Sequence, residues 1–162
     1  MLLTGFRRLE VLAMHRAWIR AKENSICLPD TKTGQQVRIL GQAAIDLLIG
    51  QPVRDDSPYV FQADWGDGHF IGVVRILDRI CTRAGLNSVT PHVLRHTFAS
   101  IAAELDFSEL TIAGLLGHVS RGVTQRYIHL DKALVLAANR VAAEVEQLVA
   151  PKLSSTLRNA AE

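Results

Sequence analysis

Cysteine is scarce in this chain, and so are long apolar runs and charge of one sign. The two cysteines, Cys27 and Cys81, have no metal-type spacing and lie among apolar neighbours, so we expect reduced, buried thiols. No segment approaches the length of a membrane span. The chain also reaches an arginine pair too early for a signal peptide. We therefore expect a soluble, cytoplasmic protein without a membrane partner.

The composition is that of one folded domain. The chain has 162 residues, of which 48% are hydrophobic and 21% charged, which is ordinary for a globular protein. The net charge of +2 permits nucleic-acid binding but does not by itself indicate it. No internal repeat or low-complexity tract interrupts the chain. We expect the fold to occupy residues 1–150, followed by a flexible tail at 151–162.

Hydrophobic periodicity and turn residues predict an α+β domain that is mainly α-helical. A polar turn at 30–34 separates two short strands at 25–29 and 36–40, with Lys32 near the tip of the hairpin. A third short strand is possible at 59–61. The expected sheet is therefore small and antiparallel, with about three strands beside a helical bundle. Seven helices are expected, beginning at Thr4 or Gly5, spanning 43–49 and 70–84, beginning at Pro91, running from 108 to 117, beginning at Val123, and running from Asp131 to about 149.

Two of these helices carry apolar stripes from which we predict burial. In the helix over 70–84 the inward positions are Val73, Ile76, Leu77 and Ile80. In the last helix, capped by Asp131, the stripe runs from Leu134 to Leu148. That stripe could pack on its own domain or dock onto a neighbouring subunit.

Six residues strung along the chain suggest a common chemistry. They are two arginines, a lysine, two histidines and a tyrosine: Arg7, Arg95, Lys32, His92, His118 and Tyr127. Two guanidinium groups can neutralise the oxygens of a phosphodiester. A tyrosine can attack the phosphorus, and a lysine can protonate the leaving oxygen. The set therefore points to cutting and rejoining of DNA strands, without a metal or another cofactor.

Each of these residues alone has a simpler explanation. Arg7 could pair with Glu10 on a helix surface, and Lys32 could be a solvated turn residue. His92 and Arg95 could be exposed polar positions of an amphipathic helix. Tyr127 could be a boundary tyrosine with a buried ring. His96 follows His92 by four residues, but no third ligand supports a zinc site. Order and spacing together favour the shared site.

The same segments resemble the catalytic domain of the tyrosine recombinases, the phage-integrase family. Residues 4–10 (TGFRRLE) are similar to the segment of the first catalytic arginine, and 31–38 (TKTGQQVR) to the lysine hairpin. Residues 91–99 (PHVLRHTFA) resemble the histidine-x-x-arginine helix nearly letter for letter. Residues 115–118 (LLGH), with Tyr127 nine residues later, match the last two catalytic positions. The resemblance spans residues 2 to about 130; Lys32 is the least specific match, with Lys22 as its rival.

The resemblance implies a role for each residue. Tyr127 would attack the scissile phosphate, forming a 3′-phosphotyrosyl enzyme and a free 5′-hydroxyl. Arg7 and Arg95 would hold the non-bridging oxygens and His118 would donate a further hydrogen bond. Lys32 would protonate the leaving oxygen and His92 would help to take the tyrosine proton. Glu10 would orient Arg7. The implied substrate is double-stranded DNA, with self-association on the DNA, for which the C-terminal helix is a candidate contact, and without metal or ATP.

The chain also departs from the family pattern. Members usually carry an N-terminal core-binding domain that closes around DNA, and we expect this chain to begin inside the catalytic domain, as an N-terminally truncated form. Two alternatives to an active recombinase therefore stay open. One is an integrase remnant that keeps the fold and weak DNA binding but does not recombine. The other is a helical DNA-binding regulator whose motifs match by chance.

Overall fold

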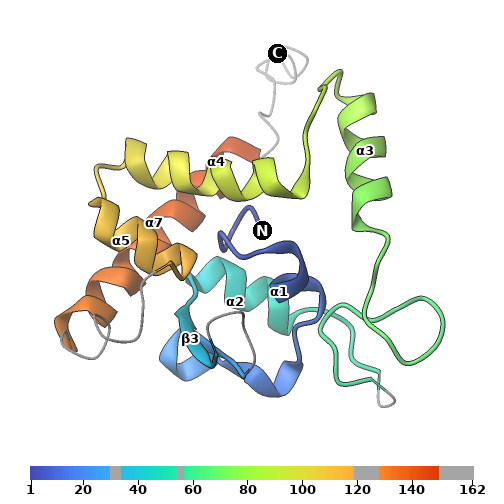
Figure 1. Cartoon of the computed structure of the whole chain (residues 1–162), viewed down its shortest axis with the longest axis horizontal. Coiled ribbons are helices and arrows are strands. Elements are labelled where there is room, and N and C mark those ends of the chain that lie inside the picture. The colour runs from blue at the N-terminus through green and yellow to red at the C-terminus, as the bar shows by residue number, and fades with distance from the viewer. Residues whose placement is uncertain (30–33, 55–56, 119–127, 150–162) are drawn as a thin grey trace, which may run out of the picture.

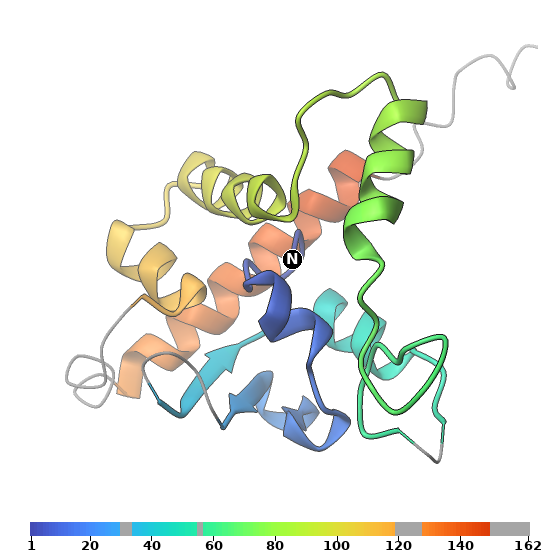
Figure 2. The ribbon, with the colours of Figure 1, turned by 45° about the vertical axis from the view of Figure 1, so that its right-hand side comes forward.

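The computed structural model describes residues 1–29, 34–54, 57–118 and 128–149. The small sheet and the helix Gln42–Ile49 lie on one side of the long C-terminal helix Ile128–Val149, and the helices Pro91–Glu104 and Glu109–Leu116 pack on its other side (Figures 1 and 2). The elements, in chain order, are α1 (Arg8–Leu12), η1 (Arg16–Trp18), β1 (Ile19–Arg20), η2 (Ala21–Glu23), β2 (Ser25–Leu28), β3 (Gln36–Ile39), α2 (Gln42–Ile49), α3 (Val73–Arg83), α4 (Pro91–Glu104), α5 (Glu109–Leu116) and α7 (Ile128–Val149).

The sheet has three antiparallel strands in the order β1-β2-β3, which confirms the predicted small sheet and its hairpin. Ser25 pairs with Ile39 and Leu28 with Gln36, so the hairpin register is continuous. The third strand is β1, and the prediction of a strand at 59–61 was wrong. Tyr59 forms an isolated bridge with His15 and lies in no strand. The predicted tip with Lys32 lies outside the described residues.

Two hydrophobic clusters make up the core. The first cluster joins the N-terminal segment, the sheet and α2, and its largest members are Phe6, Met14, Ile26, Leu40 and Ile45. The second cluster joins α4, α5 and α7, and its largest members are Phe98, Ile101, Leu115, Val141 and Val145. Each is built from the apolar stripes of its helices, which are buried because removal of apolar surface from water dominates the folding free energy.

Helix α7 packs its apolar stripe on its own domain, against α4, α5, α2 and β3. Leu134, Ala138, Val141 and Val145 are all at most 5% exposed. Leu148 is 63% exposed, so the prediction that the stripe extends to that residue was wrong at its last position. The helical backbone already includes Ile128, so the prediction that this helix begins at Asp131 was wrong.

Helix α3 stands apart from the other helices in both views (Figures 1 and 2). The helix forms where its pattern predicts, but the predicted inward face is wrong: Ile76 is 45% and Ile80 57% exposed. Cys81 is the buried residue of this helix. Periodicity makes the segment helical, whereas burial also needs a facing element, and no described helix or strand packs closely on that stripe. No helix in the described part of the chain is long and apolar enough to cross a membrane.

Candidate active site

Arg7 stands at the start of α1, not inside a helix as predicted. Its backbone is extended, with φ −68° and ψ 155°, because Gly5 before it turns the chain at φ +62°. The Glu10 carboxylate accepts a hydrogen bond from the Arg7 backbone N–H and another from the Arg7 Nη1 group, both at 2.8 Å. The expected contact between the two residues is therefore present, but it caps the helix. It holds the half-exposed Arg7 guanidinium at a fixed place.

Arg95 is buried, at 7% exposure, although the sequence predicts it on the polar face of its helix. Thr90 caps α4 by accepting a hydrogen bond from the Val93 N–H, and the Arg95 side chain leaves the second turn toward the core. Its Nη1 donates to the Gly5 carbonyl, and its Nη2 donates to the Leu116 carbonyl at 3.0 Å. These bonds satisfy part of the hydrogen-bonding capacity of the buried guanidinium, whose burial would otherwise be costly in free energy.

His118 follows the C-terminal end of α5. Gly117 adopts the left-handed conformation that ends the helix, as the sequence predicts, with φ +67°. The His118 Nε2 lies 2.8 Å from Nη2 of Arg95. A guanidinium can only donate, so Nε2 accepts and the ring proton is assigned to Nδ1. Neutral His118 therefore keeps an Nδ1–H donor available.

The pKa of His118 is lowered in a way that supports this neutral form. The side chain is exposed overall, but the ring edge against Arg95 loses hydration, and this loss lowers the pKa. The positive charges of Arg95 and then Arg7 lower it further. The site is thus most stable with its positive charge on the arginines.

His92 lies one turn before Arg95 and close to His96. The Nε2 atoms of the two rings are 2.8 Å apart, and the rings meet edge to face. One Nε2 must accept while the other donates, so the pair cannot carry two protons on these atoms. His92 is consequently fixed in orientation and has a second imidazole through which a proton can be exchanged.

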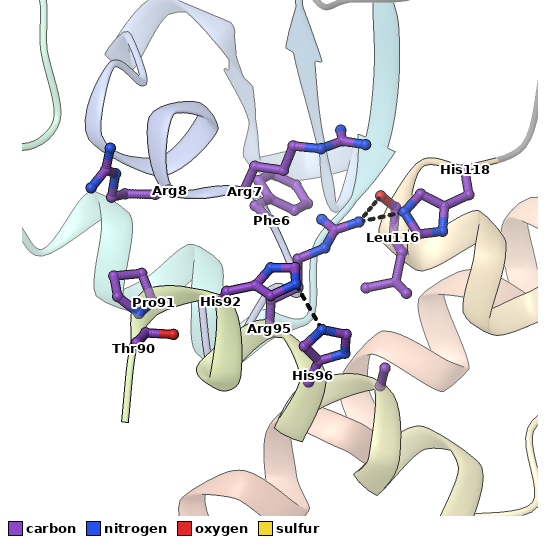
Figure 3. A pocket seen from close by; sticks show the side chains of 11 residues that line it. Phe6, Arg7, Arg8, Thr90, Pro91, His92, Arg95, His96, Leu116 and His118 are labelled. Atoms are coloured by element: carbon purple, nitrogen blue, oxygen red, sulfur yellow. Dashed lines mark hydrogen bonds between the residues drawn. The ribbon is translucent and has the colours of Figure 1, made fainter. Parts of the chain in front are cut away.

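Four of the six predicted site residues line one open pocket of about 590 Å³: Arg7, His92, Arg95 and His118. Phe6, His96 and Leu116 also line it. Figure 3 shows the Arg7 and Arg95 side chains extending toward the side where His118 lies, whereas Arg8 points the other way. Lys32 and Tyr127 lie outside the described residues, so their places stay predictions.

The pocket is strongly electropositive. Burial and the charge of Arg7 lower the pKa of Arg95, and Glu10 raises it in part. Burial alone would raise the pKa of Glu10, but hydrogen bonds from Arg7 and the charge of Arg38 bring it below its usual range. Glu10 thus interacts electrostatically with three guanidinium groups, those of Arg7, Arg38 and Arg95, and this excess of positive charge favours an anion in the pocket.

Sequence reasoning missed Arg38, which belongs to this positive group. It is 2% exposed and lies in β3 between Val37, which is 55% exposed, and Ile39. The alternation of hydrophobicity in the strand would place Val37 inward and Arg38 outward. One feature of the sequence opposes that interpretation. Arg38 lies in a strand that must pair with another strand, and one face of that pair covers the core. The Gly5 carbonyl was likewise invisible, since any residue carries a carbonyl.

The arrangement can bind one tetrahedral oxyanion. Arg95 uses both Nη2 hydrogens and one Nη1 hydrogen in the hydrogen bonds above. Its Nε–H and its other Nη1–H have no partner among the described residues and can donate to a ligand. Arg7 and the Nδ1–H of His118 add further donors. No group of three metal-ligating residues occurs among the described residues.

Comparison with known proteins places this chain in a protein family. The sequence model of the Phage integrase family matches residues 1–133. Tyrosine recombinase XerD of Brucella suis is 42% identical over 93 residues, covering 55% of this chain and 30% of that protein. Tyrosine recombinase XerC of Erythrobacter litoralis is 37% identical over 106 residues, covering 64% of this chain and 35% of that protein. The chain thus spans about a third of the length of these relatives.

Solved structures show the same fold. The integrase from mycobacterium phage Brujita has a TM-score of 0.69 at 16% identity and covers 86% of this chain and 48% of its own. The XerA recombinase crystal structure has a TM-score of 0.57 at 25% identity, with 92% of this chain and 55% of that chain covered. Both likenesses support the mainly helical fold with a small sheet that the sequence predicts.

Proposed function

Because this chain belongs to the phage integrase family, we propose that it is the catalytic domain of a tyrosine-type site-specific recombinase. Its substrate is double-stranded DNA, which it cuts and rejoins through a phosphotyrosyl intermediate. The observation that supports this most is the convergence of Arg7, Arg95 and His118 on one electropositive pocket. They come from segments far apart in the chain, and chance motif matches would not be expected to meet.

The proposed step breaks one phosphodiester bond and forms another. The Tyr127 oxygen attacks the phosphorus, and the bond to the 5′-oxygen breaks. The tyrosine proton passes to His92, which exchanges it with His96 at 2.8 Å. Lys32 gives a proton to the leaving 5′-oxygen. Arg7, Arg95 and the Nδ1–H of His118 stabilise the charge that develops on the non-bridging oxygens. A 5′-hydroxyl then reverses the step on a new strand.

Helix α3 offers a second contact with DNA. It carries exposed arginines at spacings of four, Arg75, Arg79 and Arg83, which lie along one side of the helix. Asp78 is the exposed acid of the same helix. A row of guanidinium groups suits the phosphates of a duplex. Replacing all three with glutamine should reduce the salt dependence of binding by up to about 0.9 per arginine in the log–log slope.

Self-association on the DNA belongs to the same proposal. The apolar stripe of α7 is buried within its own domain, so it does not offer a surface to a neighbour. Leu148 and Val149, each 63% exposed, form the apolar end of the helix. A neighbouring subunit would therefore contact the end of α7 and not its stripe.

Covalent capture tests the proposed activity. The chain and its Tyr127→Phe variant are incubated with labelled, nicked duplexes of randomised sequence, and adducts that survive SDS are measured. We expect an adduct with wild type and none with the variant, while duplex binding is the same for both. The phenylalanine keeps the ring and removes only the attacking oxygen.

The same assay separates the alternatives. Equal adducts from both proteins would contradict Tyr127 as the nucleophile. Duplex binding without an adduct from either protein would indicate an integrase remnant, and the assay would then be repeated with an N-terminal core-binding domain fused to the chain.

A further inference from the structure

Arg38 is a buried cation with partners on three sides. Its Nη2 donates to the Leu115 carbonyl at 2.9 Å and its Nη1 donates to Oε1 of Gln36 at 3.2 Å. Its guanidinium carbon lies 4.7 Å from the centre of the Phe6 ring. The buried Nε–H has no hydrogen-bond partner among the described residues. A buried charge with one donor unsatisfied among the described residues is costly.

The guanidinium lies close to the C-terminal end of α5. A Cβ at Gly117 would lie 1.6 Å from Nη1 of Arg38, so the turn before His118 and the arginine occupy adjoining space that only glycine leaves open. The Phe6 ring, directly before Arg7, closes the other side. Arg38 therefore touches the residue before the first site arginine and the turn that carries His118.

Two arginines cap consecutive carbonyls of the same helix end. Arg38 binds the Leu115 carbonyl and Arg95 binds the Leu116 carbonyl. The last carbonyls of a helix have no intrahelical partner and carry partial negative charge, so cations bind there favourably. The position of His118 relative to Arg95 thus depends on both guanidinium groups.

We propose that Arg38 is a positioning residue that fixes His118 and Arg7 with respect to each other across the boundary between the two core clusters. It makes no contact with DNA in this role. Arg38 lies in β3, the second strand of the hairpin that is predicted to carry Lys32. Its hydrogen bond to Leu115 therefore connects this hairpin to the C-terminal end of α5. This inference rests on the proposed function for its effect on catalysis.

The geometry assigns the effect to hydrogen bonds and not to charge alone. A lysine at this position would keep a positive charge but could not bind two acceptors in a plane while stacking on Phe6. Burial lowers the pKa of Arg38 to about 10, and the charges of Arg95 and Arg7 act in the same direction, but the group stays protonated at neutral pH. Charge and geometry can therefore be separated by substitution.

The experiment compares Arg38→Met and Arg38→Lys with wild type in single-turnover covalent capture on the nicked duplexes, with duplex affinity measured separately. We expect the capture rate to fall by about 10²-fold in Arg38→Met, because displacement of a clamp by about 1 Å can cost that much. We expect a fall on the order of tenfold in Arg38→Lys. Duplex affinity should not change. Arg20→Met, on the exposed edge of the sheet, is the matched control and should behave as wild type.

A titration of His118 by NMR provides a readout that does not depend on catalysis. The signal is identified by its loss in His118→Gln. In Arg38→Met the pKa of His118 should rise, since a positive charge that lowers it is removed, and in Arg38→Lys it should stay close to wild type. This result would support the placement of Arg38 even if wild type gave no adduct and the proposed function failed.

Three results would overturn the inference. The first is wild-type capture by folded Arg38→Met. The second is full capture by Arg38→Lys, which would assign the effect to charge. The third is an unchanged His118 titration in Arg38→Met. If Arg38→Met does not fold, the capture rate of Arg38→Lys decides between positioning and charge.

Discussion

The two core clusters differ in how they are built and in what they contribute to the pocket. The first is made of short elements, a three-stranded sheet and the eight-residue helix α2, tied together by the N-terminal segment. It carries Arg7 and Glu10. The second is made of three helices, α4, α5 and α7, and carries His92, Arg95 and His118. Neither cluster alone assembles the donors that an oxyanion would need.

The candidate active site lies at the boundary between the clusters. The carbonyl of Gly5, next to Phe6 of the first cluster, accepts a hydrogen bond from Arg95 of α4, and Arg38 of β3 donates to the carbonyl of Leu115 in the second cluster. Away from the pocket, the Gln42 N–H donates to Oδ1 of Asn139 at 2.7 Å. The geometry of the site therefore depends on how the clusters dock, as well as on each fold.

The largest effect should come from removing the arginine that bridges the clusters at the pocket. In Arg95→Ala we expect covalent capture to fall by about 10²- to 10³-fold, because the group that we propose to stabilise developing charge is lost. The free energy of unfolding should fall by roughly 3 kcal/mol, since charge-assisted hydrogen bonds to two carbonyls are lost. Capture kinetics and urea unfolding measure the two effects. Wild-type capture by Arg95→Ala would contradict its role.

A substitution at Gly41 tests the packing between the two clusters at a place outside the pocket. A Cβ there would lie 2.6 Å from the Ala138 carbonyl oxygen in α7, so Gly41→Ala must push the clusters apart. We expect the free energy of unfolding to fall by about 1–3 kcal/mol. Gly68→Ala is the control, because no atom lies within 4 Å of its Cβ position. Equal stability of the two variants would show that the boundary is not tightly packed.

A substitution at Glu10 tests how Arg7 is anchored beside the first cluster. Glu10→Gln removes the charge and one of two acceptors that hold Arg7, so we expect capture to slow by about tenfold while duplex affinity stays the same. Glu23→Gln is the control: its ion pair with Arg20, at 3.6 Å, is exposed and should contribute little to stability. If both variants captured DNA at the wild-type rate, Arg7 would not depend on its anchor.

The smallest effect should be a pH dependence of stability from the second cluster. The pKa of His118 is lower in the folded than in the unfolded chain, whose value is near 6.5. Below that pH the unfolded chain binds a proton that the folded chain resists, so stability is complete above about pH 6.5 and falls as pH decreases toward the folded pKa. Unfolding of His118→Gln should show a smaller loss over this range. An identical pH profile would contradict the shift.

Local patterns predicted most of the secondary structure because they depend on short-range chemistry. The capping residue and proline at Thr90 and Pro91 start α4, and Gly117 ends α5, as expected. The hairpin and α2 also formed where the sequence predicts. Among the described site residues, the meeting of Arg7 and Glu10 could be predicted, since they are three apart, although the helix begins later than expected.

Burial was predicted less well where it depends on a distant partner. The stripe of α3 is largely exposed, because periodicity does not reveal whether another element faces it. Arg95 and Arg38 are buried although arginine is usually exposed. Both are buried because carbonyls from other segments accept their hydrogen bonds, and those carbonyls have no signature in the sequence.

The sequence by itself predicted the kind of chemistry, since residue types and their spacing along the chain indicate arginines, histidines and a tyrosine acting on a phosphate. Only the tertiary structure decided which of the described ones meet, and that Arg38 lies against Phe6 and the end of α5. The physical reason is range: helix caps and turns are set within a few residues, whereas Arg95 reaches Gly5 across 90 positions and Arg38 reaches Leu115 across 77. Such contacts exist only once both core clusters have formed and docked.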